Sequence, residues 1–359
     1  MNVDIDSQTI TKSTNRYYNH FLLQMNQLLR NEFFLSDYIY KFANFDLDMI
    51  QTGFMTEGYF DTFNMDAILL AGESGQVKMN RKEGAFENED NSTLRYEFAF
   101  SPNTGFLASP DHLLKDTELK ISFDRTPPMT SLLEVSSVKN ECKYLEIKDC
   151  YAVTEYVSSP SLRDYFAKID TTPLVYEYDD CEVILKSIPL HDTDIRFDTI
   201  RGGNIPDYIF AALVPQDSLN GEFETSSTYF KRHKVKLQTK PSSNYNQVNE
   251  LNFTLNGNSV NGYPMSLKHG SPIGPMQKFF DVTNRLYNVQ CGDSIDQIAF
   301  HYNFIWGHKF EGESTGNGWC GIDLKLDSGF AENMILVVWI VTSSALTLDK
   351  FHQIEKLQL

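Results

Sequence analysis

Few residues in this chain have the types and spacing that chemistry would need. Residues 312–316, with Ser314 at the centre, fit the G-x-S-x-G pattern of a serine hydrolase. That pattern requires a strand before the serine and a helix after it, so that the hydroxyl is presented at a sharp turn. Here a glycine-rich stretch and then an alternating strand pattern follow. The sequence therefore favours a plain loop over a hydrolase site.

Histidine and carboxylate pairs are the other candidates for chemistry. His301 and His308 stand in no HExxH motif or facial triad, and neither Asp179-Asp180 nor the pair Asp192 and Asp194 matches a calcium loop. The chain also has no G-x-G-x-x-G and no Walker A motif. We therefore predict ordinary histidines and turn carboxylates, with no catalytic, cofactor-binding or metal-binding residue, and a protein that is not an enzyme.

One basic segment stands out in an acidic chain. The formal net charge is -17, yet a single short run carries four cations: Lys231, Arg232, Lys234 and Lys236. Copies of like charge repel one another, so close association requires local complementarity. We predict these four residues as a candidate subunit interface, facing an acidic surface of a neighbouring subunit or an internal partner. The alternative is a strand whose charges are simply solvated.

Composition narrows the class of protein. The acidic balance disfavours binding to nucleic acid or to an anionic membrane. Five cysteines, an odd number at wide spacing and without CxxC, indicate reduced thiols of an intracellular fold. The first residues lack the apolar core of a signal peptide, and no segment predicts a transmembrane helix. Hydrophobic residues at 41% and aromatic residues at 13% are ample for folded β-rich cores.

The elements that would position any site are strands. Residues 320–327 alternate apolar and polar side chains, which is typical of a half-buried strand. The apolar run at 334–341 predicts a strand buried on both faces, and residues 345–348 predict a separate last strand. Asn256-Gly257 suits a type I′ hairpin turn because both central positions need positive φ. Further strands are expected at 68–70, 96–100, 119–123, 144–147, 151–157, 182–187, 195–200, 208–214 and 251–255.

Helices are expected only as insertions. Apolar residues at helical spacing predict helices over 17–29, 162–166 and 272–286, and the first fifteen residues are expected to be loose. No β-α-β alternation occurs, so a doubly wound fold is disfavoured. A polar stretch at 168–173 ends in Thr-Thr-Pro and predicts two domains, 1–169 and 170–359. The expected fold is mainly β: two tandem sandwiches with inserted helices.

The second block resembles a known family, the double jelly-roll major capsid proteins of Polinton/Maverick elements and adintoviruses. The similarity is a pattern of strands and turns over about residues 110–359. It is carried by residues 203–214 with Asn220-Gly221 after them, by residues 250–257 with Pro264 following, and by residues 318–326, 330–339 and 348–350. Relatives begin with several more strands before the segment similar to residues 15–29. The first jelly roll of this chain is thus expected to be incomplete, completed by helices, or completed by another chain.

The resemblance implies a structural major capsid protein. Such proteins form pseudo-hexagonal trimeric capsomers of an icosahedral virion or virus-like particle, and the family has no catalytic residues or cofactors. The implied partners are further copies of the chain (a homotrimer and its shell neighbours) and a penton or minor capsid protein, without specific nucleic-acid binding or membrane insertion. The implied location is the virion, assembled in the cytoplasm or nucleus of the host cell. The alternative is a non-catalytic glycan-binding jelly-roll module, in which Trp306 or Trp319 would stack on sugar rings.

Overall fold

The structure is a computed structural model with a mainly β fold, as the sequence predicts, and its strand pairs are antiparallel. It describes residues 2–12, 85–87, 94–96, 105–108, 117–123, 158–168, 172–216, 248–260, 265–266, 277–279, 281–282, 305–310, 317–330, 333–349, 351 and 353–358. Most of the described residues lie after residue 170, in the second of the two predicted blocks.

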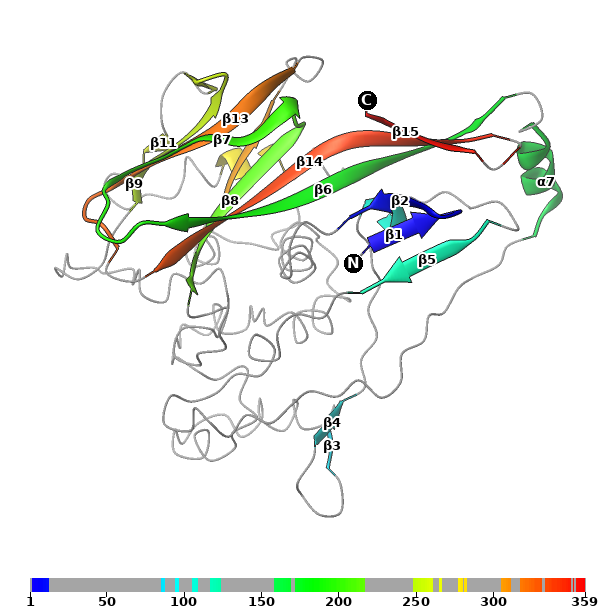
Figure 1. The fold of residues 1–359 in the computed structure, drawn as a ribbon, viewed down its shortest axis with the longest axis horizontal. Coiled ribbons are helices and arrows are strands. Elements are labelled where there is room, and N and C mark those ends of the chain that lie inside the picture. Colours follow the sequence, from blue (N-terminus) through cyan, green and yellow to red (C-terminus); the bar gives the residue numbers. More distant parts are fainter. Residues whose placement is uncertain are drawn as a thin grey trace.

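The largest part of the fold is a sandwich of two antiparallel sheets (Figure 1). One sheet places β12, β8, β14 and β6 side by side, and the other places β9 between β13 and the short strands β10 and β11, with β7 beyond β13. The bounds are β6 Leu174–Ile188, β7 Asp194–Asn204, β8 Tyr208–Pro215, β9 Val248–Leu255, β10 Asn258–Ser259, β11 Met265–Ser266, β12 Ile305–Lys309, β13 Asn317–Leu326 and β14 Met334–Leu348.

This strand order is that of a jelly roll. Counted along the chain, with β10 and β11 sharing the fifth position, one sheet holds the first, eighth, third and sixth strands. The other sheet holds the second, seventh, fourth and fifth. Strands that follow one another in sequence therefore tend to lie in opposite sheets, as two Greek keys require. The jelly roll predicted for the second block is confirmed by this topology.

The central strand β14 explains the long apolar run. It pairs with β6 along its whole length, and its other edge pairs first with β8 and then with β15, Ile354–Gln358. All residues from 334 to 341 are buried. Alternate side chains of a strand point to opposite faces, so both faces of this sheet must be covered. The predicted strand with two buried faces is confirmed.

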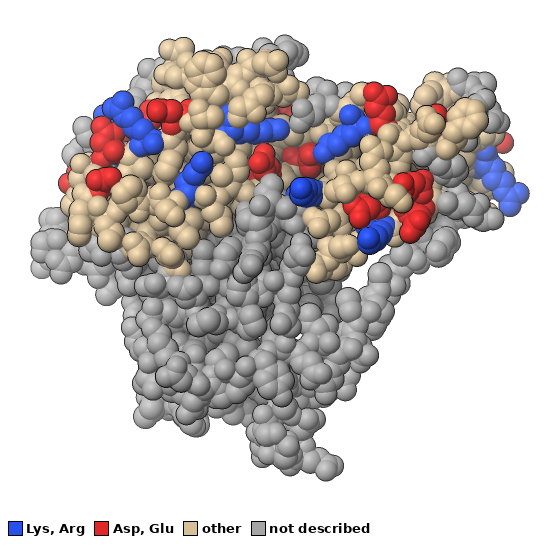
Figure 2. Space-filling model, in the orientation of Figure 1, with Lys and Arg blue, Asp and Glu red and all other residues tan. Residues whose placement is uncertain are grey.

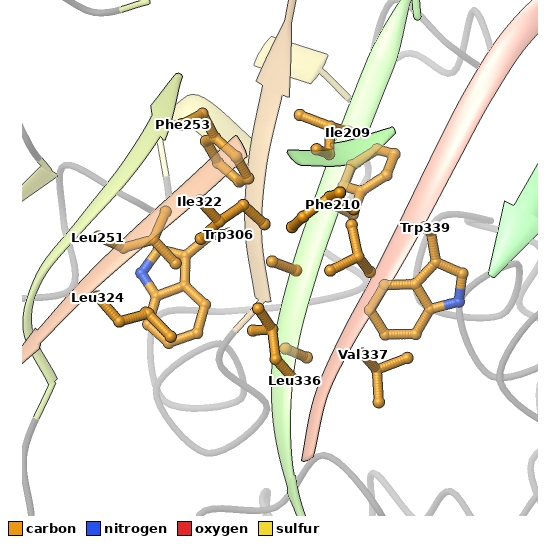
Figure 3. Close-up of a cluster of buried hydrophobic side chains, with 14 of the residues drawn as sticks. Ile209, Phe210, Leu251, Phe253, Trp306, Ile322, Leu324, Leu336, Val337 and Trp339 are labelled. Atoms are coloured by element: carbon orange, nitrogen blue, oxygen red, sulfur yellow. The ribbon is translucent and has the colours of Figure 1, made fainter. Parts of the chain in front are cut away.

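The inner face of this sheet packs against the second sheet. His308 on β12 stacks on Phe253 of β9 with ring centroids 6.1 Å apart, and Trp306 shares its face of β12. In Figure 3, Trp306 lies on the side of Leu251 and Leu324, whereas Trp339 lies away from them. Each of these side chains except His308 is buried, so the interior of the sandwich is filled with apolar groups.

The outer face of the same sheet is covered near Trp339. Phe210 is the cross-strand neighbour of Trp339, and both are buried. The ring of Phe279 meets that of Phe210 edge-on, with centroids 6.2 Å apart. Residues 277–279 and 281–282 are helical, in agreement with the helix predicted over 272–286. This helical segment therefore helps to bury the outer face.

A second core lies where β6 and β14 extend beyond the sandwich. There the strands cover a sheet of order β2-β1-β5, with β1 Asn2–Ile5, β2 Gln8–Thr11 and β5 Leu119–Ser122 (Figure 1). Phe106, in the short 3-10 helix η1 Gly105–Ala108, meets Tyr176 and Tyr178 edge-on at 5.9 and 5.6 Å. The cluster is completed by Ile5, Ile10, Leu174, Leu346 and Leu348.

Two expectations about the ends of the chain are wrong. Residues 2–11 are not loose: they form the β1–β2 hairpin, which buries Val3, Ile5 and Ile10. Residues 345–348 are not a separate strand, because β14 runs without a break through the polar residues 342–344. Those residues stay extended because they pair with β6 between the two cores.

The predicted hairpin at Asn256-Gly257 is confirmed. Asn256 has φ 52° and Gly257 has φ 80°, and β10 folds back on β9 directly after them. The turn is fixed further because the Trp319 N–H donates to Asn256 Oδ1 at 3.0 Å, while the Asn256 N–H donates to the Trp319 carbonyl at 2.9 Å. The turn therefore also positions the start of β13.

Replacing Gly257 by Val is expected to destabilise the fold by about 1 kcal/mol or more. A Cβ on Gly257 would have no atom within 4 Å, so the cost comes from positive φ and not from a clash. Gly202 is a matched control, since it is equally open but lacks positive φ. Thermal unfolding should show a lower midpoint for Gly257→Val and little change for Gly202→Val; equal midpoints would contradict the prediction.

The remaining elements are short. The predicted helical turn at 162–166 is confirmed as α7, Pro160–Ala167, and a small hairpin joins β3 Ala85–Glu87 to β4 Leu94–Tyr96. The helix predicted over 17–29 and the strands predicted at 68–70, 144–147 and 151–157 lie outside the described residues. No helix in the described part of the chain is long and apolar enough to cross a membrane.

Candidate subunit interface

The residues predicted from sequence for an interface lie outside the described part of the chain. These residues are Lys231, Arg232, Lys234 and Lys236. Ser314 and His301, which are candidates for chemistry by sequence, also lie outside it. The four basic residues therefore remain a prediction. The described residues instead offer three surfaces for contact with a neighbour: the outer face of the second sheet, the junction between the two cores, and the outer face of the second core.

The outer face of the second sheet carries polar side chains that pair with one another. Lys325 Nζ lies 3.1 Å from Glu250 Oε2 on the neighbouring strand. Arg196 lies 3.3 Å from Asp194, and this hydrogen-bonded carboxylate raises the pKa of the guanidinium. Asn252 Nδ2 donates to Asp323 at 3.4 Å. Figure 2 shows Lys and Arg beside Asp and Glu across the described surface, so charge is largely compensated locally on the face shown.

Trp319 is the exposed aromatic residue of this sheet. Its side chain is 46% exposed, whereas Trp306 is 2% exposed inside the sandwich. The expectation that Trp306 could stack on a sugar is therefore wrong, because its ring fills the interior. Trp319 stays available, held at the start of β13 by the hairpin turn at Asn256.

Asp179 and Asp180 do not form the turn predicted from sequence; they lie within β6. Neighbouring residues of a strand point to opposite faces, so the two carboxylates cannot share one cation as a chelating pair. Asp180 accepts a hydrogen bond from Lys356 Nζ at 2.6 Å. Burial, and then the nearby Asp207, raise the pKa of Asp179. Asp207 Oδ2 accepts the N–H of Ser343 at 2.6 Å, which ties the start of β8 to β14.

Lys356 joins three distant parts of the chain. Besides Asp180 it donates to the carbonyl oxygen of Ile10 at 3.1 Å, and its ammonium group lies 5.9 Å from the centre of the Tyr178 ring. It thus connects β15 to the N-terminal hairpin and to β6. Sequence reasoning missed it. The alternating pattern of residues 354–358 indicates a strand, but nothing in the sequence indicates the residues that Lys356 contacts.

The outer face of the second core is partly apolar and acidic. On this face β15 contributes Glu355 and Leu357, and β6 contributes Val175 and Glu177. Val175 is 48% and Leu357 39% exposed, and both glutamates are exposed. Ala345 lies between Leu357 and Glu177 in the register and is fully buried.

Two cysteines lie among the described residues. Cys181 and Cys320 form no disulfide there. Burial raises the pKa of Cys181, with the carboxylates of Asp179 and Asp180 adding to the effect, and raises that of Cys320 to about 11. Thiols with raised pKa values are poor nucleophiles at neutral pH. These two cysteines therefore belong to the packing of the fold.

Comparison with known proteins gives weak similarities to viral structures. No protein-family model matches the sequence, and no curated protein matches it. Among solved structures, the chain is similar to a chain of the Sputnik virophage cryo-EM structure (TM-score 0.31, 10% identity, covering 52% of this chain and 39% of that one). It is also similar to the PBCV-1 virus capsid (0.33, 8%, 55% and 54%) and to the mavirus major capsid protein (0.33, 6%, 56% and 44%). The chain spans about half the length of these structures or less.

Proposed function

We propose that this chain is a structural major capsid protein of a virion or virus-like particle. The observation that carries the proposal is the jelly-roll strand order of a sandwich whose interior is filled by large apolar side chains. Jelly rolls serve as shell proteins and as lectins. A filled interior suits a shell protein, which works through its outer surfaces and not through an internal site. The sequence resemblance to double jelly-roll capsid proteins supports the same assignment.

The proposal extends to assembly. The chain self-associates as a trimer with pseudo-hexagonal outline, and trimers pack side by side in an icosahedral shell that forms inside the host cell. The sequence resemblance to capsid proteins of Polinton/Maverick elements and adintoviruses supports this arrangement, as does the division into two blocks that the sequence predicts at about residue 170. A penton or minor capsid protein would be a further partner. No catalytic step and no cofactor belong to this function.

Self-association is the direct test. Size-exclusion chromatography with light scattering should give the mass of a trimer, and negative-stain electron microscopy at higher concentration should show particles or sheets of capsomers. The protein should be tested over a range of salt concentrations and pH values. A strictly monomeric protein at high concentration under all of these conditions would overturn the proposal.

A second function is favoured by one observation, the exposed ring of Trp319. Aromatic rings on the surface of jelly-roll domains can stack on sugars, and the polar groups of the second sheet could hydrogen-bond hydroxyl groups. If the chain is a glycan-binding module, the purified protein binds members of a glycan array, and Trp319→Ala abolishes the binding without changing the fold. Because a capsid protein can also bind glycans, only binding in the absence of assembly would favour this function over the first.

A further inference from the structure

The strand β15 has an open edge. It pairs with β14 on one side, and no strand among the described residues pairs with the other side (Figure 1). The Asp349 N–H donates to the Gln353 carbonyl at 3.1 Å, so these two residues are a hydrogen-bonded pair at the start of the β14–β15 ladder. Since hydrogen-bonded pairs alternate in an antiparallel ladder, the backbone groups of Ile354, Lys356 and Gln358 point away from β14. Such an edge can accept a strand from another chain.

The side chains beside this edge define what would fit. Glu355 and Leu357 alternate along β15 on the outer face, and Glu177 lies two strands away on the same face. Neither glutamate forms an ion pair with a cation of the described residues. A matching strand would therefore place a basic side chain beside Glu355 and an apolar side chain two residues away, beside Leu357.

One segment of the chain has this pattern. Phe230 and Arg232 are two residues apart, as Leu357 and Glu355 are, and Lys234 and Lys236 continue the same alternating series. In an extended conformation the four side chains would share one face. The segment is the single strongly basic run in a chain of net charge -17, so its charge complements the acidic face.

We propose that residues 230–236 of one copy add as an antiparallel strand to the open edge of β15 of a second copy, with Phe230 beside Leu357 and Arg232 beside Glu355. The inference rests on the proposed self-assembly and names its contact. The main-chain hydrogen bonds supply much of the affinity, and the charges set which segment is accepted.

Charge exchange tests the pairing. At low ionic strength, where screening is least, Glu355→Lys should raise the concentration needed for half-assembly about ten-fold, and Arg232→Glu should do the same. The combined variant, which restores the parental net charge, should recover assembly. The matched control joins Arg232→Glu to Asp198→Lys, a residue that is exposed elsewhere, and should not recover it. Recovery in the control, or none in the combined variant, overturns the pairing.

A binding assay separates this contact from assembly. A fluorescent peptide of residues 229–237 should bind the full chain, as measured by anisotropy, and binding should weaken at least ten-fold in Glu355→Lys but not in Asp198→Lys. Gln358→Pro removes one outward N–H without touching the pairs with β14 and should also weaken it. Assembly of the parent without any peptide binding overturns the inference alone. A parent that neither assembles nor binds the peptide overturns both proposals.

Discussion

Acidification from pH 7 to pH 4 is expected to lower the free energy of unfolding by up to about 3 kcal/mol through His308 alone. His308 stacks on Phe253 and meets Phe310 edge-on at 4.9 Å inside the sandwich. Burial, and then the positive charge of Lys278, lower its pKa from 6.5 to about 4. Between pH 6.5 and pH 4, His308 therefore carries a proton in the unfolded chain but not in the folded chain. Stability is complete above pH 6.5 and is lost as the pH falls toward 4.

The variant His308→Phe isolates this effect. A phenyl ring can keep the contacts with Phe253 and Phe310 but cannot be protonated. Urea unfolding of both proteins at several pH values between 7 and 4 should show a steeper loss of stability for the parent, with the difference confined to this interval. Carboxylates titrate in both proteins and cancel in the comparison. Parallel pH profiles would show that the pKa of His308 is the same in the folded and the unfolded chain, as for a solvated imidazole.

Replacing Trp339 by Ala should cost about 3–5 kcal/mol, a larger effect than that of Gly257→Val. Trp339 is 1% exposed in the central strand and lies on the outer face of its sheet, beside Phe210. Its removal would leave a cavity between the sheet and the segment that carries Phe279. Chemical unfolding followed by circular dichroism should show the loss as a lower midpoint with a similar slope.

Trp319→Ala is the matched control for this measurement. The same atoms are removed, but from a side chain that is 46% exposed, so little buried surface is lost. Its stability should change by less than about 1 kcal/mol. If the two variants were equally stable, the outer face near Trp339 would not be a packed surface, and the burial of both faces of β14 would be wrong.

The sequence predicted the sandwich well where packing and local pattern agree. Ile322, Leu324 and Leu326 alternate with polar residues because only one face of β13 lies on the core. Residues 334–341 are uniformly apolar because both faces of β14 are buried there. The hairpin at Asn256 was predictable because its turn chemistry is local. These signals depend on neighbours in the chain, so a single sequence is sufficient to find them.

The errors arise where the determining contacts are distant. Residues 342–344 are polar and indicate a break, yet they remain in β14 because β6 pairs with them over a long sequence separation. The first residues look loose by composition, although Ile5 and Ile10 complete a core with side chains from the opposite end of the chain. The contact of Lys356 with Asp180 and Ile10 could not be predicted for the same reason, and it positions the edge strand of the proposed contact.

The place of β14 in the chain has a consequence for the order of events during synthesis. It is the last of the sandwich strands to leave the ribosome, yet it forms the ladder with β6 and β8 and contributes to both cores. Until it emerges, β6 lacks the strand that pairs with it along all 15 of its residues. Native structure in both cores must therefore wait for it, and folding is expected to be slow because these pairings are so distant in sequence. A nascent chain cannot present a finished surface to its neighbours, which delays association until translation has passed this strand.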